Sequence, residues 1–243
     1  MASFLLVHGA WHGGWCWDRL APHLAAAGHR VQSPDLPGHG EDRTPRWRVT
    51  LSHYVEAVHE IARAEAEPVI AVGHSMGGLV LSQAVHDAPE LFAGRVYLCA
   101  FVPEHGDSLA SLGRADPGSG VPLALRLRGL HPEIEPDRSR EVFYGDCTEE
   151  DVAWATERLC PNPIWPILQG ASIERPIEVP AAYIECTEDR AVSLGHQRCM
   201  RDRLRDPDVV TMTVSHSPFL SSPKELARHL DEYADRLASR TDR

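Results

Sequence analysis

Ser75 is the side chain with the clearest potential for chemistry, because it stands at the centre of the pentapeptide Gly73-His-Ser-Met-Gly77. An apolar, β-branched run at 69–72 precedes the pentapeptide, and apolar residues with helical spacing follow it. Strand, sharp turn and helix form the context in which a G-x-S-x-G sequence becomes a nucleophile elbow. Glycines are needed on both sides, since a Cβ would crowd the strained turn. The pattern therefore predicts that Ser75 is a nucleophile whose neighbouring N–H groups, at a helix N-terminus, favour negative charge.

A base must accept the proton of that serine, and His216 is the predicted one. In doubly wound α/β enzymes the reactive groups lie at the carboxyl ends of strands. Where the nucleophile sits on such an elbow, the chain order is Ser, then acid, then His. His216 directly follows the predicted strand 209–214. His196 and His229, the other late histidines, fall in helical patterns.

Asp189 is the predicted acid, because it follows the predicted strand 179–185 and precedes His216. Its carboxylate would accept a hydrogen bond from Nδ1–H of that histidine, fix the tautomer and stabilise the imidazolium. Asp107 is the alternative, since its loop also follows a predicted strand and opens at the same edge. Glu188 is adjacent to Asp189 but is expected to point elsewhere in a tight loop.

Three further histidines lie near these residues in the predicted fold. His74 adjoins the nucleophile but lies inside the turn, so its side chain is expected to pack or hydrogen-bond beneath the elbow. His8 and His12 belong to a glycine-rich loop after the predicted strand 4–7, where acyl-transfer enzymes place a second oxyanion donor. Both are expected to brace that loop. None has metal-ligand spacing with a carboxylate partner, so no metal and no other cofactor is predicted.

Six strands and their flanking helices are predicted to position these residues. The strands are predicted at 4–7, 29–33, 69–72, 95–102, 179–185 and 209–214, and the main helices at 17–27, 52–66, after 77 to about 87, and 223–238. Continuous apolar runs alternating with helical patterns are typical of an α/β fold with a mostly parallel sheet.

The alternation of strands and helices stops after Pro103 and returns at Val179. We therefore expect an insertion at 104–178, between core segments 1–103 and 179–243, with helices at about 149–159 and 164–169. Because it follows a core strand, the insertion is predicted to form a lid over Ser75. The residues predicted to contact the substrate are Trp11, His12, Phe101, Trp154 and Trp165, and Leu125 and Leu127 could also line the lid or form its own core.

The chain of 243 residues suits one α/β domain with an inserted lid. A net charge of -11 argues against nucleic acid or an anionic membrane surface as a partner. No apolar run is long enough to cross a bilayer, and no basic N-terminal region indicates a signal peptide. The six cysteines lack C-x-x-C and metal-ligand spacing, and Cys99 and Cys186 are expected to be buried thiols. These features predict a cytoplasmic, reduced protein.

Four segments resemble a known family. They are 6–15, 73–78, 186–189 with Gln197 eight residues on (197 − 189 = 8), and His216. Together they resemble the α/β-hydrolase superfamily, and within it the small plant-type methylesterase and hydroxynitrile lyase family with its bacterial esterase relatives. The resemblance covers nearly the whole chain but is weak in the insertion.

The resemblance implies Ser75, Asp189 and His216 as a catalytic triad, with the N–H groups of Ala10 and Met76 as oxyanion donors. It also implies an α/β-hydrolase fold with a central sheet of about six strands and an inserted helical lid.

Departures from the lyase branch favour ester hydrolysis. Hydroxynitrile lyases of this family carry a Thr after the first His of the loop, a Cys after the nucleophile and a Lys after the catalytic His. Those positions here are Gly9, Met76 and Ser217. A lyase needs a cation near the departing cyanide, and Ser217 cannot supply one. His74 in the elbow also matches the esterases, since lyases tend to have Glu there.

The sequence therefore predicts a serine hydrolase that cleaves a small carboxylic ester through an acyl-enzyme intermediate. One alternative is a C–C or hydroxynitrile-type lyase on the same triad, because this superfamily uses one constellation for several chemistries. Another is a ligand-binding protein on a hydrolase frame, against which an intact Ser, His and Asp argues. The expected partner is a small-molecule ester, and a homodimer is suggested by the resemblance alone.

Overall fold

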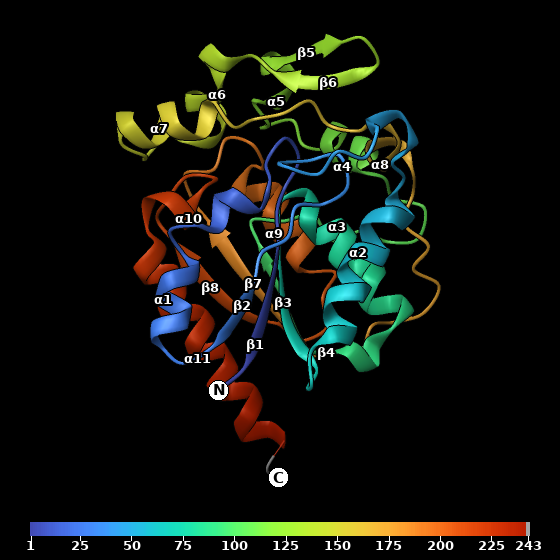
Figure 1. Ribbon diagram of the computed structural model, residues 1–243, viewed down its shortest axis with the longest axis vertical. Coiled ribbons are helices and arrows are strands. Elements are labelled where there is room, and N and C mark those ends of the chain that lie inside the picture. Colours follow the sequence, from blue (N-terminus) through green and yellow to red (C-terminus); the bar gives the residue numbers. More distant parts are fainter. Residues whose placement is uncertain (242–243) are drawn as a thin grey trace.

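A six-stranded parallel sheet forms the centre of the computed structural model, which describes residues 1–241 (Figure 1). The strands are β1 Ser3–Val7, β2 Arg30–Gln32, β3 Val69–His74, β4 Phe92–Leu98, β7 Ala181–Cys186 and β8 Asp208–Met212, in the spatial order β2-β1-β3-β4-β7-β8. Every neighbouring pair in this sheet is parallel. The predicted α/β class and the predicted strand number are confirmed.

Burial along the strands follows their place in the sheet. Every residue of β3 and β7 is buried, whereas the edge strands β2 and β8 are only partly buried. A strand covered by helices on both faces needs apolar residues on both faces, so its sequence is a continuous apolar run. The same property made the inner strands easy to predict.

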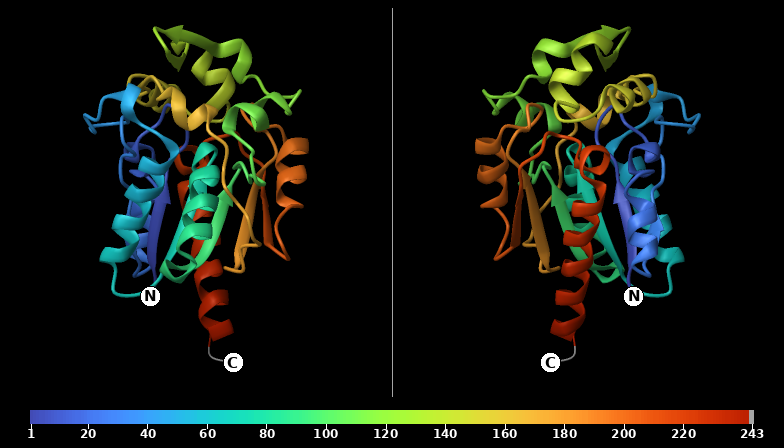
Figure 2. Two further views of the ribbon diagram at one scale, coloured as in Figure 1. Left: turned by 90° about the vertical axis from the view of Figure 1, so that its right-hand side faces the viewer. Right: turned by 90° about the vertical axis from the view of Figure 1, so that its left-hand side faces the viewer.

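Helices cover both faces of the sheet (Figure 2). The helices of the core are α1 Ala21–Ala26, α2 Leu51–Ala64, α3 Met76–Asp87, α9 Leu194–Arg201, α10 Pro218–Ser221 and α11 Pro223–Thr241, with short 3-10 turns at Gly14–Trp17, Arg46–Arg48 and Pro89–Leu91. Helices α1 and α11 lie on one face, and α2 and α3 lie on the other. Helix α9 packs against β7.

Among the boundaries predicted for the core elements, those of one helix and one strand differ most from the structure. The predicted helix 17–27 is divided into the turn Gly14–Trp17 and α1, because Pro22 lacks an N–H and disfavours a helix through the residues before it. The predicted strand 95–102 is shifted, since β4 begins at Phe92 and ends at Leu98. Cys99 follows with φ 37° and turns the chain toward the elbow, although its thiol is buried as expected.

The chain between β4 and β7 forms a separate group of elements above the carboxyl ends of the strands, at the end of the molecule away from both termini (Figure 1). It contains α4 Leu109–Arg114, α5 Val121–Ala124, β5 Leu125–Arg128, β6 His131–Ile134, α6 Pro136–Phe143, α7 Glu149–Thr156 and α8 Ile164–Leu168. Strands β5 and β6 form an antiparallel hairpin that is not predictable from the sequence, because four residues of alternation are too few to distinguish a strand. Within residues 1–241, no helix is long and apolar enough to cross a membrane.

Candidate active site

Ser75 lies in a strained turn between β3 and α3. Its backbone has φ 53° and ψ −120°, which a residue other than glycine adopts only when its surroundings hold it there. A Cβ on Gly73 would lie 2.6 Å from the carbonyl oxygen of Gly77, and a Cβ on Gly77 would lie 2.5 Å from that of Val7. The two glycines of the pentapeptide are therefore required by backbone contacts on both sides of the serine.

Gly77→Ala is expected to lower the stability of the fold by about 1–3 kcal/mol, because the new methyl group would overlap a buried backbone oxygen that cannot move freely. Thermal unfolding of the variant measures this effect. Gly195→Ala in α9 is the matched control, since nothing lies within 4 Å of the added Cβ, and it is expected to be neutral or stabilising. Equal melting temperatures for the two variants would contradict the steric argument.

Asp189 and His216 form a buried pair at the carboxyl ends of β7 and β8. His216 Nδ1 donates to Asp189 Oδ2 at 2.7 Å, and both side chains are almost completely inaccessible to solvent. The other carboxylate oxygen, Oδ1, accepts from the N–H groups of Ala191 and Val192 at 2.7 and 2.9 Å. Gln197 Nε2 also donates to Oδ2, at 3.2 Å. Four donors therefore hold the carboxylate in one orientation, with Nδ1 of the histidine protonated and Nε2 left free.

The other acids considered from the sequence are placed elsewhere. Asp107 pairs with Arg203 at 2.8 Å and also accepts from the N–H of Glu104 at 3.0 Å. Glu188 is exposed to solvent, as expected for a residue that points out of a tight loop. Only Asp189 among these three carboxylates is bonded to His216.

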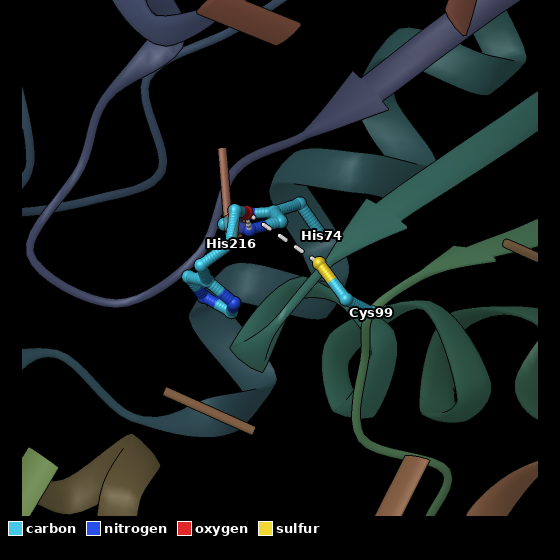
Figure 3. Close-up of side chains that lie close together, drawn as sticks. All are labelled: His74, Cys99 and His216. Atoms are coloured by element: carbon cyan, nitrogen blue, oxygen red, sulfur yellow. Dashed lines mark hydrogen bonds between the residues drawn. The ribbon is translucent and has the colours of Figure 1, made fainter. Parts of the chain in front are cut away.

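His74 and Cys99 both approach the backbone carbonyl of His216 (Figure 3). His74 Nε2 donates to this oxygen at 2.9 Å, and the Cys99 thiol donates at 3.5 Å. Burial lowers the pKa of His74 and raises the pKa of Cys99, so the ring stays neutral and the thiol stays protonated. The expectation that His74 forms a hydrogen bond beneath the elbow is confirmed. Through this bond, the His74 side chain supports the loop that carries His216.

The same three residues offer ligand atoms within 4.8 Å of one another. Their chemistry does not favour a metal, because Cys99 keeps its proton, His74 Nε2 is already a donor, and Nδ1 of His216 is bonded to Asp189. The absence of a metal stays a prediction.

The loop after β1 is held by its own histidines. The N–H of Leu36 donates to His8 Nε2 at 3.0 Å, so Nδ1 carries the proton and donates to the carbonyl of Gly9 at 2.8 Å. His12 Nδ1 is 2.9 Å from the carbonyl of Ala10, and its Nε2 is 2.8 Å from the hydroxyl of Tyr144. Both rings therefore brace this loop, as expected.

Trp11 is the strained residue of this loop, with φ 63°. Its backbone N–H donates to Asn162 Oδ1 at 3.1 Å, and its indole N–H donates to the carbonyl of Pro132 at 3.0 Å. Its backbone carbonyl accepts a hydrogen bond from the backbone N–H of Cys160 at 2.9 Å. All three partners belong to the insertion, so the insertion holds the backbone next to Ala10 in its conformation. Within residues 1–241, the backbone N–H groups of Ala10 and Met76 donate no hydrogen bond to a protein acceptor.

Acid is expected to destabilise the fold between about pH 6.5 and pH 3. Burial lowers the pKa of His8 to about 4 and that of His12 to about 3. The unfolded chain therefore binds protons below about pH 6.5 that the folded chain cannot bind, and stability falls as the pH drops. Each ring is expected to cost about 2 kcal/mol between pH 7 and pH 5. Urea unfolding at pH 7, 6 and 5 measures how the free energy of unfolding changes with pH. His12→Gln should reduce this change, and a wild-type stability that does not depend on pH would contradict the argument.

A cavity of about 370 Å³ opens above Ser75. Its lining includes Ala10 and Met76, the two residues whose N–H groups are the predicted oxyanion donors. Most of its other lining side chains are apolar, and Arg114 is the one charged side chain among the lining residues that the structure describes. Those apolar residues include Leu109, Val121, Leu125, Phe143, Ile164, Ile167 and Val192.

Two of the five predicted substrate contacts, Trp11 and Phe101, line this cavity, and three do not. His12 is turned toward Ala10 and Tyr144 beneath the loop. Trp154 packs edge-on against Trp15. Trp165 is 47% exposed and donates to the carbonyl of Trp47. These three side chains do not line the cavity, because tryptophan and histidine also form packing and hydrogen-bonding contacts that sequence position does not reveal. Their role in substrate binding stays a prediction. Leu127 is likewise exposed, whereas Leu125 reaches the cavity.

The segment 143–146 contributes to the site without having been singled out from the sequence. The ring of Phe143 lies 5.6 Å from that of His216 and also lines the cavity. The Asp146 carboxylate accepts hydrogen bonds from the N–H and the hydroxyl of Ser215. An aromatic pair followed by Gly and Asp inside a polar stretch was the one available signal, and it does not specify a partner 69 residues away.

The fold and this arrangement of residues define the alpha/beta hydrolase class. Residues 4–229 match the model of the Alpha/beta hydrolase family, and the chain belongs to that family.

Curated relatives include a pyrethroid hydrolase of Sphingobium wenxiniae, 34% identical with 97% of this chain and 88% of the relative covered. They also include methylesterase 1 of Arabidopsis thaliana, 31% identical with 96% of each chain covered. A solved pyrethroid hydrolase structure has a TM-score of 0.86 at 29% identity, with 98% of this chain and 99% of that chain covered. The resemblance to methylesterases and bacterial esterases is confirmed, and the chain is an enzyme of the hydrolase class.

Proposed function

We propose that this enzyme is a serine esterase that cleaves a carboxylic ester with an apolar acyl or alcohol part. The observations that carry the proposal are the buried pair of Asp189 and His216, joined at 2.7 Å, and the serine in a strained turn at an apolar cavity. The esterases among the relatives support ester hydrolysis in general.

The proposed reaction begins when His216 Nε2 accepts the proton of Ser75 and the hydroxyl oxygen attacks the ester carbonyl. The N–H groups of Ala10 and Met76 stabilise the oxyanion, and a donor of this kind contributes about 3–4 kcal/mol to the reaction. His216 then protonates the departing alcohol. Water, activated by the same histidine, hydrolyses the acyl-enzyme and releases the acid.

The substrate class follows from the cavity. Its volume of about 370 Å³ is near the lower end of the range for small-molecule sites, roughly 300–1,000 Å³. Apolar walls favour medium-length or aromatic groups over charged ones. We propose that residues 104–178, which supply much of this wall, act as a lid. The cytoplasmic location and the homodimer stay predictions.

A panel of p-nitrophenyl esters from acetate to octanoate tests this proposal, beside a cyanohydrin-cleavage assay and labelling by a fluorophosphonate. We expect ester turnover that rises toward medium chains, and a single adduct on the peptide that contains Ser75. Ser217 is fully buried and uncharged, so no cation is supplied at the position where the lyases carry Lys, and cyanohydrin cleavage is not expected. Cyanohydrin or C–C cleavage without ester turnover would overturn the proposal. Binding without any turnover would favour the ligand-binding alternative.

A further inference from the structure

A second cavity of about 340 Å³ lies apart from the cavity above Ser75 and shares no lining residue with it. Its walls come from residues 173–177, where the insertion returns toward β7, from the segment after α9, and from the loop after β4. Ser82 of α3 and Arg95 of β4 also line it, so the cavity lies on the sheet face that α3 covers. The proposed ester hydrolysis does not use this cavity.

Arg95 is a buried cation that lines this cavity, and its side chain has no acidic partner. The residue is 5% exposed. Its guanidinium donates to the carbonyls of Val179 and Ile177 and to the hydroxyl of Tyr97, each at 3.1 Å. These bonds use three of its five N–H groups. No carboxylate among the described residues lies within 4.0 Å of it. A buried guanidinium without a counter-charge is costly, so this arrangement favours an anion in the cavity.

The other charged groups of this cavity are mostly neutralised or exposed. Arg203 pairs with Asp107 at 2.8 Å, and Arg205 pairs with Glu178 at 3.1 Å. Arg175 is exposed, donates to the carbonyl of His86 and has no acidic partner within the described chain. The remaining titratable lining residues are the exposed Glu104, His105 and Glu174. Two cations without carboxylate partners, Arg95 and Arg175, therefore line one cavity in a protein of net charge -11.

We propose that this second cavity is a binding site for a small oxyanion, carboxylate or phosphate, held by the guanidinium groups of Arg95 and Arg175. A guanidinium presents donors in a planar fork that matches both kinds of oxyanion. Because Arg95 already holds the carbonyls of Ile177 and Val179, a bound anion fixes the segment that joins the insertion to β7. The competing role of Arg95 is a purely structural clamp on that segment, which requires no ligand.

The test is titration of the whole protein with sodium phosphate and with sodium succinate, at constant ionic strength maintained with sodium chloride. Calorimetry measures the affinity, and the melting temperature provides a second measurement. We expect saturable binding in the millimolar range and a rise in melting temperature with phosphate, succinate or both. Comparing the two anions shows whether the site prefers phosphate or carboxylate. No ester is turned over in this experiment, so its result does not depend on whether the proposed esterase activity is correct.

Four variants assign the binding to this cavity. Arg95→Met is expected to weaken the affinity at least tenfold and Arg175→Gln several-fold, whereas Glu174→Gln is expected to strengthen it by removing a competing negative charge. Arg158→Gln, on the insertion and outside this cavity, is the control and should bind as the wild type does. If Arg95→Met does not fold, the proposal is tested by the other two variants, since Arg175→Gln should weaken the affinity for the anion and Glu174→Gln should strengthen it. Absence of saturable binding, or equal affinities in these variants, would overturn the proposal and leave Arg95 as a structural clamp.

Discussion

Ser75→Ala will reduce ester turnover by a factor of about 10⁵ or more, since the acyl-enzyme cannot form without the hydroxyl and loss of a serine nucleophile elsewhere costs ~10⁶ in kcat. The alanine keeps the Cβ that the strained turn accommodates, and only one oxygen atom is lost from the edge of the cavity. We therefore expect the melting temperature to change little and an ester to bind without being cleaved. Steady-state kinetics with the preferred nitrophenyl ester, together with thermal unfolding, measures both effects.

Ser217→Ala is the matched control for the loss of a hydroxyl group near the site. Ser217 directly follows His216 and is fully buried, but its Oγ has no hydrogen-bond partner within the described chain. Removal of this oxygen should leave turnover within about threefold of the wild type, because surrounding groups lose no bond. Retained turnover in Ser75→Ala would show that another group attacks the ester, and equal losses in both variants would indicate a general disturbance of the elbow.

Asp189→Asn is expected to reduce kcat by about 10⁴, the effect of the equivalent change in a serine protease. Oδ1 of Asp189 accepts from two backbone N–H groups, which require an oxygen at that position. An asparagine must then turn its NH₂ group toward His216, where the carboxylate oxygen now accepts from Nδ1. A donor at that position forces the proton of the imidazole onto Nε2, which then cannot accept a proton from Ser75.

Asp107→Asn tests the alternative acid under the same conditions. Asp107 pairs with Arg203 outside the cavity above Ser75, and the substitution should change kcat less than threefold. The pH profile gives a second measurement, because partial recovery of Asp189→Asn at high pH would indicate that the wrong tautomer is the cause. A large loss in Asp107→Asn with normal activity in Asp189→Asn would reverse the assignment of the acid.

The elbow was predictable because its cause is local. Gly73 and Gly77 are required by contacts within a few residues or with the adjacent strand, and the apolar run before them indicates a central strand. His216 was also predictable, since its position after a late strand follows from chain order alone. The end of β4 was not predictable, because the turn at Cys99 depends on hydrogen bonds that the N–H groups of Ser75 and Phe101 donate only in the folded chain.

The residues that line the cavity above Ser75 could not be predicted from the sequence alone. Trp154 and Trp165 have the size and apolarity of substrate contacts, yet one packs on Trp15 and the other bonds to the backbone of Trp47. Phe143 has the same character and lies against the ring of His216. Aromatic residues gain similar free energy from burial in any of these places, so residue type alone cannot choose among them.

The sequence by itself determined the α/β class, the elbow at Ser75 and a late histidine, His216, that follows a strand, because periodicity, glycine sterics and chain order are properties of short segments. The tertiary structure decided which carboxylate meets the histidine, which side chains surround the serine, and that Asp146 and Asn162 of the insertion hold the loops of the core. It also placed Arg95 without a counter-charge beside a second cavity. These features depend on the orientation of segments far apart in the chain, which packing of the whole molecule sets.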